Sequence, residues 1–300
     1  MQTSLKRIRE QRGLAAASLA HRIGVERQTI YAIEAGTYVP NTTIALRLAA
    51  VLETTVEQLF SPNNRDTPTR VMNLTIAGCD PALRFLASEL EGYNMDLVTL
   101  PSGSHRALNW LKEGMVPIAG SHILDAGTGT YNLPAIKRLF DPKQIKVVTF
   151  ANWQQGLMLR RNNGKDIRGM ADLARKEIRF LNREGGSESR KVVERELRTL
   201  GIKTKGVTGW RHTATGHLPA AWQIANGEAD CCVGAETAAR HFGLRFLPLT
   251  TERFDLTMTA ESWHLPGMQT LLDTLSKGSF RKRLHTLAGH DTSETGTIRL

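Results

Sequence analysis

The sequence predicts two domains of different fold class: an all-α domain in residues 1–62 and a bilobal α/β domain in residues 71–300. Three observations predict this division. Apolar residues recur at three- and four-residue steps in the first part, whereas short apolar runs alternate with amphipathic segments in the second. The stretch between them, "SPNNRDTPTR", is rich in proline, asparagine and charge, so residues 63–70 are expected to form a linker. A chain of 300 residues is long enough for two domains that each have a core.

Five short helices are expected in the N-terminal domain. The apolar positions at helical spacing include Leu5, Ile8, Leu14, Leu19, Ile23, Ile30 and Ile33. Gly13, Gly24 and Gly36 follow these segments and are typical helix stops. The "IGV" around Gly24 predicts a tight turn, and the small Ala20 allows the two flanking helices to cross closely, as in a helix-turn-helix. "NTTIALRLAAVL" and "TVEQLF" supply the fourth and fifth helices.

The stretch "VERQTIYAIEAGTYVPNTTIALRLAAVLETTVEQLF" resembles the Cro/repressor-type (XRE) helix-turn-helix family, and the resemblance covers residues 4–60. The family implies binding to double-stranded operator DNA, usually as a homodimer. The resemblance places the recognition helix at residues 26–35. The candidates there for contacts with bases or phosphates are Arg27, Gln28, Thr29 and Tyr31, because Arg and Gln can pair with guanine and adenine edges.

Basic residues of the first helix are candidates for phosphate contacts, namely Lys6, Arg7 and Arg9. Solvation of an exposed helix face is the alternative for all these polar side chains. Family members commonly have a Ser/Thr-Gln pair at the start of the second helix, where the Gln braces the recognition helix and a phosphate. This chain has Ala15 and Ala16 there, so that contact is expected to be missing.

Strands and helices are expected to alternate in the second domain. "VMNLTIAG", "MDLVTL" and "VPIAGSHI" predict strands separated by the helices "PALRFLASELEG" and "SHRALNWLKEG", a βαβαβ run that indicates a mostly parallel sheet. A second run of separate strands is expected at "KVVTFAN", "GLMLRR", "IRFLN", "ADCCVG" and "LRFLPL". "FDLTMTAE" and two helices then return to the first lobe. Lobe 1 is expected in about residues 71–150 and 250–300, and lobe 2 in about 151–249.

Five stretches together resemble the periplasmic-binding-protein-like (type II) domain that is grouped with molybdate-binding proteins. They are "GCDPALRFLASEL", "AGSHILDAGTGTYN", "NREGGSESR", "GHLPAAWQIANGEADCCVGAETAA" and "LPLTTERFDL". The resemblance covers about residues 71–295. It implies a bilobal fold with a small ligand between the lobes, at the carboxyl ends of strands, and an oxyanion such as molybdate or tungstate as that ligand.

The stretch "NREGGSESR" gathers hydrogen-bond donors in front of a helix expected to begin at about Ser189. Free backbone N–H groups and the positive end of the helix converge on this loop. The side chains expected to complete an anion site are Arg183, Ser187, Ser189 and Arg190, with helix capping as the alternative for the serines. Related domains typically have glycine where this chain has Glu188. Its carboxylate either points outward or indicates a ligand with a cationic end.

Further ligand contacts are expected from loops elsewhere in the domain, at Ser104, His122, Tyr131, Asn132 and His217. A helix cap is the alternative for Ser104, and a structural histidine is the alternative for His122. A metal site is the weaker interpretation of His122 and Asp125, because two ligands fall short of the three protein groups that zinc normally has. Neither a metal nor another cofactor is therefore expected.

The net charge of +10 favours polyanions or small anions as partners. Residues 160–211 hold 15 Lys and Arg against 7 Asp and Glu, so most of the excess is expected around the anion site. Three cysteines without a framework spacing indicate a reducing compartment, and no apolar run is long enough for export or membrane insertion. A cytoplasmic protein is expected.

These features predict a ligand-responsive transcriptional regulator, a homodimer or higher homo-oligomer that binds double-stranded operator DNA and senses a small anion. A molybdate- or tungstate-like oxyanion is the first choice, and an organic carboxylate or a zwitterionic metabolite is the alternative. A DNA-binding protein with an enzymatic C-terminal domain is the alternative of another class, but "GGSES" is not a Gly-x-Ser-x-Gly nucleophile motif and no catalytic residue is expected. A transport protein would need an export signal.

Overall fold

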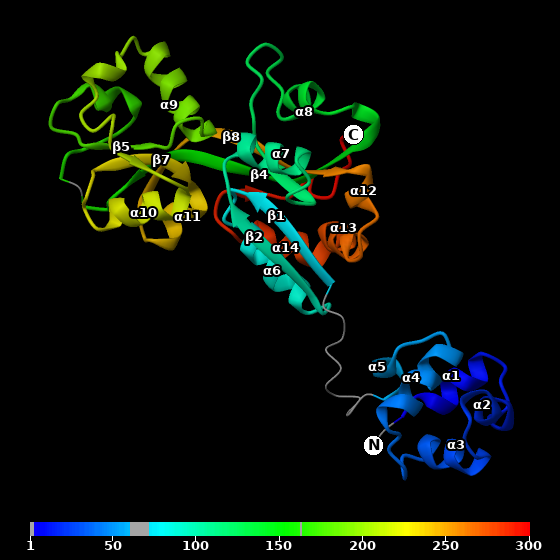
Figure 1. Cartoon of the computed structure of the whole chain (residues 1–300). Helices are drawn as coiled ribbons and strands as arrows, with labels where there is room; N and C mark the ends of the chain where they lie inside the picture. Colours follow the sequence, from blue (N-terminus) through cyan, green and yellow to red (C-terminus); the bar gives the residue numbers. More distant parts are fainter. Residues whose placement is uncertain (1–2, 61–71, 163) are drawn as a thin grey trace. The chain divides into compact units, whose positions relative to one another are not determined.

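The computed structural model describes residues 3–60, 72–162 and 164–300, and the chain divides into two compact units, Met1–Val71 and Met72–Leu300. The expected linker, residues 63–70, lies outside the described residues. Each unit has a hydrophobic core of its own. The prediction of an all-α domain followed by an α/β domain is confirmed (Figure 1).

Five helices form the first unit, as expected from its periodicity. They are α1 (Leu5–Gln11), α2 (Ala16–Ile23), α3 (Arg27–Glu34), α4 (Thr42–Val51) and α5 (Val56–Leu59). Gly24 ends α2 in the left-handed conformation with φ +74°, where glycine meets no steric penalty. The Val25 N–H donates to the Ala20 carbonyl oxygen at 3.0 Å and closes the turn into α3. Leu19, Ile30 and other apolar side chains of these helices form one buried core, so the helix-turn-helix is held by packing.

Lobe 1 of the second unit is formed by the first and the last parts of that unit's sequence. Its elements are β1 (Met72–Gly78), α6 (Leu83–Glu91), β2 (Met95–Pro101), α7 (Ser104–Lys112), β3 (Ile118–Ser121), α8 (Leu133–Leu139) and the 3-10 turn η1 (Pro142–Gln144). The end of the chain returns to this lobe through α12 (Ala260–Trp263), α13 (Met268–Ser276), α14 (Gly278–His285) and β9 (His290–Asp291). The cores show α6, α13 and α14 on one face of the sheet and α7 and α8 on the other.

Lobe 2 has the same layered arrangement. Its elements are η2 (Met170–Ala174), β5 (Phe180–Arg183), α9 (Glu188–Thr199), η3 (Thr204–Gly206), β6 (Thr213–Ala214), α10 (His217–Ala225), β7 (Cys231–Ala235) and α11 (Glu236–His241). One apolar cluster joins α9 and η2 to the strands, and a second joins α10 and α11 to the opposite face. Cys231 and Cys232 point to these two different cores and are fully buried.

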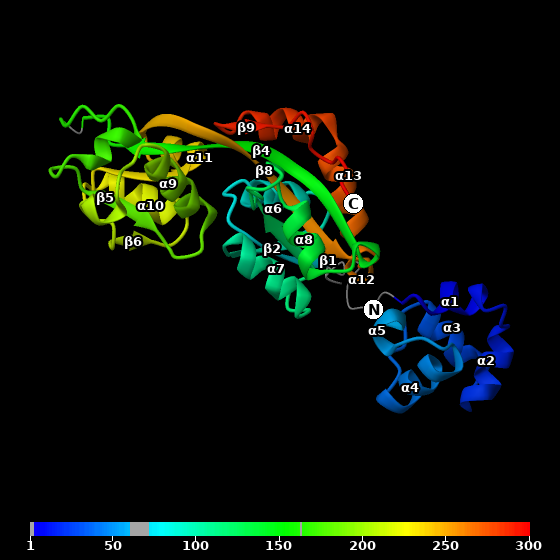
Figure 2. The ribbon, with the colours of Figure 1, turned by 90° about the horizontal axis from the view of Figure 1, so that it is seen from above.

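Two long strands connect the lobes. They are β4 (Ile145–Leu159) and β8 (Arg245–Thr259), which pair antiparallel and run together from one lobe to the other (Figures 1 and 2). The sequence pattern had predicted two separate strands in place of each of them, one for each lobe. That prediction is wrong, because polar residues in the middle of each strand continue the ladder. Gly156 permits this at a register shift, where a Cβ atom would lie 2.2 Å from the Leu247 carbonyl oxygen.

The sheet is mixed, not mostly parallel as predicted. Its strand order is β2-β1-β3-β8-β4-β7-β5-β6, with β9 paired to β4. The outer pairs of each lobe are parallel, but β8 and β4 run antiparallel to their neighbours in the centre. The central strands had looked parallel in sequence because the helical segments around them resembled βαβ crossovers. None of the helices in the described ranges has the length and apolar character that a membrane crossing requires.

Candidate functional site

Buried polar side chains from both lobes meet over the two long strands. Trp153 and Gln155 are two residues apart on β4, and Glu252 of β8 pairs directly with Trp153, so these three side chains share one face of the strand pair. His122 joins them from the loop after β3. Lobe 2 adds the side chains of Arg183, Ser189 and His217. The interlobe cluster thus consists of His122, Trp153, Gln155, Arg183, Ser189, His217 and Glu252, each at most 3% exposed.

His122 is held between a carboxylate and a sulfur atom. Its Nδ1 lies 2.5 Å from Glu252 Oε2, and Gln155 Nε2 donates to the same oxygen at 2.5 Å. Its Nε2 lies 3.1 Å from Cys79 Sγ. Burial by itself would lower the pKa of His122, but Cys79 and the Glu252 carboxylate raise it well above its usual value. Both neighbours therefore favour the protonated form of the His122 ring.

His217 is held in the opposite charge state. Arg183 Nη1 donates to His217 Nδ1 at 3.0 Å, and the Ala235 backbone N–H donates to the same nitrogen at 3.1 Å. A ring nitrogen that accepts hydrogen bonds carries no proton, so the proton lies on Nε2. Burial, followed by the charges of Arg183 and His122, lowers the pKa of His217 well below its usual value. His217 is a neutral ring whose Nε2–H donates to no described residue.

The loop in front of α9 differs in detail from the prediction. The helix begins at Glu188, one residue earlier than expected, and Ser187 is its N-cap, with the hydroxyl accepting from the Arg190 N–H at 3.3 Å. Capping therefore accounts for Ser187. The Ser189 hydroxyl is turned to the interlobe cluster instead, 3.4 Å from Arg183 Nη1. Arg183 also donates through Nε to Glu184 at 3.0 Å, so its charge is already paired.

Glu188 does not point outward. Its side chain is 4% exposed and lies 2.7 Å from Lys191 Nζ and 3.3 Å from Nε2 of His105, which belongs to helix α7 of lobe 1. Burial opposes ionisation, but hydrogen bonds from His105 and Lys191 and the charge of His122 lower the pKa of Glu188. A charged carboxylate of lobe 2 thus contacts lobe 1 at the edge of the interlobe cluster.

Arg190 does not join the cluster, contrary to the prediction. Its Nε donates to Glu194 at 3.0 Å, and its guanidinium lies 5.2 Å from the centre of the Trp210 ring. The reason is helical geometry, because residues four apart share a helix face and this face of α9 points away from lobe 1. Arg190 lines an open cavity of about 440 Å³ on that outer side, together with Glu194, Arg198, Ile202, Thr204 and Trp210.

Two further candidates, Ser104 and Asn132, position the loops. Ser104 Oγ accepts from the His122 backbone N–H at 3.1 Å, and the N-cap of α7 is Gly103, so Ser104 is not a cap. Asn132 Oδ1 accepts from the Ile123 N–H while its Nδ2 donates to Asp255 and Arg253, which leaves Asn132 no free group for a ligand. Asn132 was predicted to contact the ligand, but these hydrogen bonds engage its amide in holding the loop.

Tyr131 keeps a hydroxyl beside the site. It donates to the Thr251 carbonyl oxygen at 3.2 Å. Burial and the neighbouring Glu252 charge raise the pKa of Tyr131 to about 12, so the phenol stays neutral. It is half-buried and remains a candidate for ligand contact.

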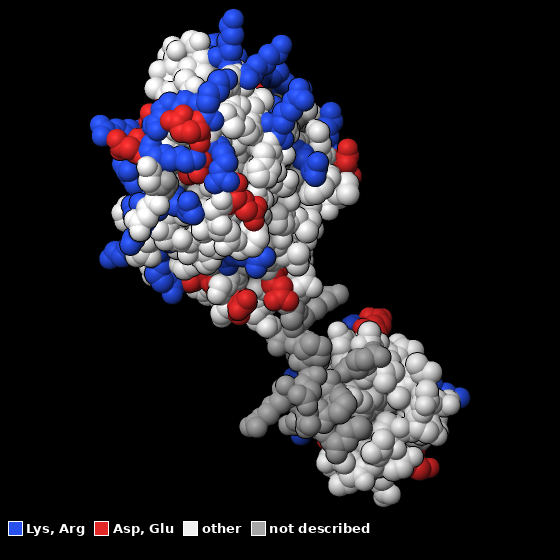
Figure 3. Space-filling model, turned by 90° about the vertical axis from the view of Figure 1, so that its left-hand side faces the viewer, with Lys and Arg blue, Asp and Glu red and all other residues white. Residues whose placement is uncertain are grey.

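The basic excess of residues 160–211 lies mostly on the outer surface of lobe 2. Figure 3 shows Lys and Arg side chains spread over that face. Exposed basic residues of this segment include Arg161, Lys176, Arg198, Lys203, Lys205 and Arg211. Arg183 is the one that belongs to the interlobe cluster, so the charge count did not locate the site as expected.

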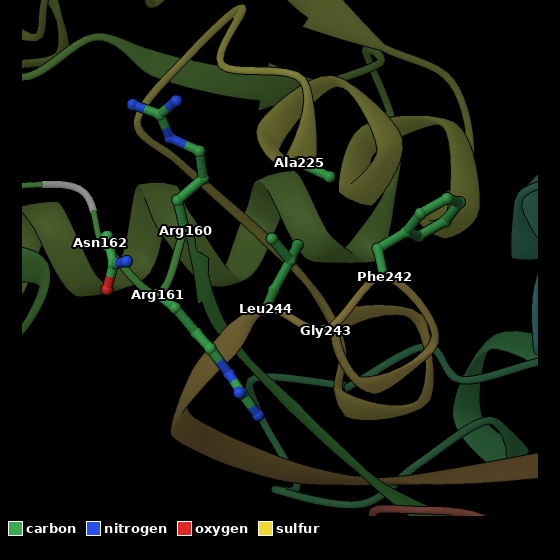
Figure 4. Close-up of a pocket in the computed structure, with 7 residues that line it drawn as sticks. All are labelled: Arg160, Arg161, Asn162, Ala225, Phe242, Gly243 and Leu244. Atoms are coloured by element: carbon green, nitrogen blue, oxygen red, sulfur yellow. The ribbon is translucent and has the colours of Figure 1, made fainter.

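A second small cavity on lobe 2 does not gather functional groups. Arg160, Arg161 and Asn162 line it together with Ala225, Phe242, Gly243 and Leu244. Figure 4 shows that the side chains of Arg160 and Arg161 point to opposite sides, so they do not converge on a shared ligand. No group of three or more His, Cys, Asp or Glu side chains in the described parts of the chain could hold a metal ion.

The first unit presents its candidate DNA contacts on α3 and α1. Arg27, Gln28 and Tyr31 are exposed on α3, and Arg27 Nη2 donates to the Tyr31 hydroxyl at 2.6 Å. Thr29 is half-buried beside them. On α1, Lys6 and Arg7 are exposed. Arg9 is not available for phosphate contact, because it is 8% exposed and its Nε donates to Glu34 at 2.6 Å.

Sequence reasoning missed three members of the interlobe cluster: Trp153, Gln155 and Glu252. A signal was present, since "ANWQQG" and "LTTERF" interrupt apolar strand runs with polar residues. Polar side chains within a buried strand need partners, which is a reason to examine such positions as sites.

Comparison with known proteins supports both halves of this description. Residues 85–276 match the PBP superfamily domain, and residues 5–59 match a helix-turn-helix family. YvgK of Bacillus subtilis is 31% identical over 229 residues, which cover 76% of this chain and 74% of YvgK. A phosphate ABC transporter substrate-binding protein with bound phosphate from Clostridium perfringens superposes with a TM-score of 0.57 at 12% identity, covering 73% of this chain and 99% of that one. The tungstate ABC transporter structure from Geobacter sulfurreducens gives a TM-score of 0.51 at 13% identity, covering 71% and 98%.

The lowered pKa of His217 makes a prediction about acid stability. A buried neutral histidine contributes stability that is complete above about pH 6.5 and is lost as the pH falls toward its lowered pKa. We expect His217 to add up to about 1.4 kcal/mol per pH unit to the acid loss of unfolding free energy. His217→Asn, which keeps an acceptor near Nδ1, should remove this part of the slope in urea titrations from pH 7.5 to 5.5. His264→Asn, at an exposed histidine, is the control, and an unchanged slope in His217→Asn contradicts the assignment.

Proposed function

The chain belongs to the PBP superfamily by residues 85–276 and carries a helix-turn-helix domain before it; from this premise we propose that it is a transcriptional regulator that binds operator DNA and responds to a small ligand. Operator half-sites are usually read by two recognition helices, so we propose a homodimer. We further propose that it acts in the cytoplasm, where its DNA lies.

One observation carries the sensing half of this proposal. The interlobe cluster buries donors from both lobes, and His217 Nε2–H and the Ser189 hydroxyl lie there beside the N-terminus of α9. Fixed donors that lack an internal acceptor are suited to a ligand. The positive end of α9 favours a negative charge at this point.

We therefore propose that the ligand presents an anionic group to Ser189, His217 and the first turn of α9. An inorganic oxyanion such as molybdate, tungstate or phosphate has such a group, and an organic acid has it too. Of the transporter structures that share the fold, one contains bound phosphate and the other is named a tungstate ABC transporter. These names support a small anion as the kind of ligand, and the side chains of the site decide which anion fits.

We propose that ligand binding acts through β4 and β8. These strands are the long connections between the lobes, and His105 of lobe 1 contacts Glu188 of lobe 2 beside the proposed site. A ligand that bridges the lobes shifts the population toward the closed arrangement, and closure changes the spacing of the two recognition helices in a dimer.

One arrangement favours a second candidate, an enzymatic second domain. Cys79 Sγ, His122 and Glu252 form a chain of thiol, imidazole and carboxylate with contacts of 3.1 and 2.5 Å. This is the order of groups in cysteine nucleophiles that are activated by histidine. Cys79 is half-buried, whereas Cys231 and Cys232 are fully buried.

The DNA-binding half predicts different effects for two substitutions. Gln28→Ala should reduce discrimination between operator and random duplex by about 1–3 kcal/mol, because a base contact is lost. Lys6→Ala should weaken both duplexes alike and lower the salt dependence by about one phosphate contact. Fluorescence anisotropy at several salt concentrations measures both. Equal losses on the two duplexes for Gln28→Ala exclude a base contact.

The ligand-binding half predicts a contrast between neighbouring residues of α9. A thermal-shift screen with molybdate, tungstate, phosphate and small organic acids identifies the anions that bind. For the best of them, Ser189→Ala should lower the affinity in calorimetry about tenfold or more, because a charge-assisted hydrogen bond is lost. Arg190→Ala is the matched control and should leave the affinity unchanged, since Arg190 faces Glu194 and Trp210. If Arg190→Ala weakened binding and Ser189→Ala did not, the ligand would instead lie in the cavity lined by Arg190, Glu194 and Trp210.

The enzymatic candidate predicts fast alkylation of Cys79. Iodoacetamide, followed by peptide mass spectrometry, should label Cys79 at least about tenfold faster than free glutathione, and His122→Gln should abolish the excess rate because the imidazole no longer contacts sulfur. Cys231 and Cys232 serve as internal controls, since both are buried. A Cys79 that reacts no faster than glutathione removes this candidate.

A further inference from the structure

Two polar atoms in the interlobe cluster are buried without a partner. They are Trp153 Nε1, a donor, and Gln155 Oε1, an acceptor, and both residues are at most 1% exposed. Buried polar groups in proteins are almost always hydrogen-bonded, so each such exception requires an explanation. Because the two residues are neighbours on one face of β4, the same explanation applies to both.

From these two atoms, and resting on the proposed sensing function, we propose that the ligand is a small organic acid that also carries a hydroxyl or ammonium group. Its acid group accepts from Trp153 Nε1–H and the α9 donors, and its hydroxyl or ammonium group donates to Gln155 Oε1. Gln155 thereby decides between such acids and anions that can only accept hydrogen bonds.

The orientation of the Gln155 amide is fixed. Its Nε2 donates to Glu252 Oε2 at 2.5 Å, and a flipped amide would set its oxygen against the carboxylate oxygen. Glu252 in turn is held by His122 at 2.5 Å. Gln155 Oε1 is therefore a preset acceptor, which a bare oxyanion without hydrogen atoms cannot satisfy.

The position of Trp153 indicates where the acid group of the proposed ligand would lie. Its ring lies 5.1 Å from the His122 ring and 5.0 Å from the His217 ring, between the two lobes. The His217 ring, whose Nε2–H donates to no described residue, is thus a direct neighbour of the tryptophan ring. Residues two apart on a strand are about 7 Å apart, so the two unpartnered groups suit a ligand whose acid and donor groups are separated by a few bonds.

The charges of the site also disfavour a doubly negative oxyanion. Arg183 is paired with Glu184, and the His122 imidazolium is paired with Glu252. Glu188 adds a charged carboxylate at the edge, where Lys191 and His105 contact it. A dianion such as molybdate would bring two negative charges to one point of the cluster, where no cation is unpaired, whereas the acid group of the proposed ligand brings one, which an ammonium group would balance.

The test uses the full chain and two matched sets of acids. One set is propionate, L-lactate and L-alanine, and the other is succinate, L-malate and L-aspartate; molybdate and tungstate are added as anions that only accept hydrogen bonds. Calorimetry should show a hydroxy or amino acid of one set binding at least about tenfold tighter than its unsubstituted counterpart. Gln155→Met should bring that ratio close to one. Trp153→Phe should weaken all members of the set alike, while Trp210→Phe, on the outer side of α9, should change none.

A second measurement uses the unaltered protein. The indole N–H resonance of Trp153, assigned by its loss in Trp153→Phe, should shift downfield when the preferred acid is added, because the N–H gains an acceptor. If molybdate or tungstate binds more tightly than every acid, or if the unsubstituted acids bind equally well, this proposal is wrong and the regulator with a small-anion ligand stands. If none of these probes binds or alters DNA binding, the small-anion proposal is wrong as well.

Discussion

The antiparallel pairing of β4 with β8 is the interaction on which the rest of the second unit depends. Both strands are 15 residues long, and each contributes to the sheets of both lobes. Trp153, Gln155 and Glu252 stand in the middle of this pair, and Trp153 also belongs to an apolar core of lobe 1. The ladder hydrogen bonds hold these side chains in place while the lobes supply the remaining groups. A ligand site built on strands that both lobes share can respond to the relative position of the lobes.

Burial and neighbouring charge give two histidines opposite roles in the same small region. His122 receives a carboxylate and a sulfur as neighbours and is held charged, whereas His217 receives a guanidinium and a backbone N–H and is held neutral. The interlobe cluster is therefore a set of hydrogen-bond donors and acceptors in defined positions, not a generally positive site. This explains why the charge count over residues 160–211 was a poor guide to the site: most of those side chains are solvated on the surface of lobe 2.

Sequence-based prediction succeeded where an element depends on local interactions and failed where it depends on contacts between distant parts of the chain. Helices of the first unit were predicted because their apolar spacing and Gly24 are local signals. Capping of α9 by Ser187, the alternative to a ligand contact, was recognised from the strand-to-helix loop for the same reason. The orientation of the Arg190 side chain could not be predicted, because Glu194 and Trp210 contact it only once α9 has packed. The continuity of β4 across "ANWQQG" also depended on a partner strand about ninety residues later in the chain.

The sequence by itself determined the two-unit organisation, the helix-turn-helix and the loop of donors at α9, because periodicity, turn residues and caps act over a few positions. Tertiary structure alone decided which of the candidate side chains share a site. It brought His122, Arg183, His217 and Glu252 together from four separate segments, set the proton positions on the two rings and left Trp153 and Gln155 without partners. Charge state and hydrogen-bond satisfaction are properties of neighbours in space, and those neighbours exist only after the lobes have folded around β4 and β8.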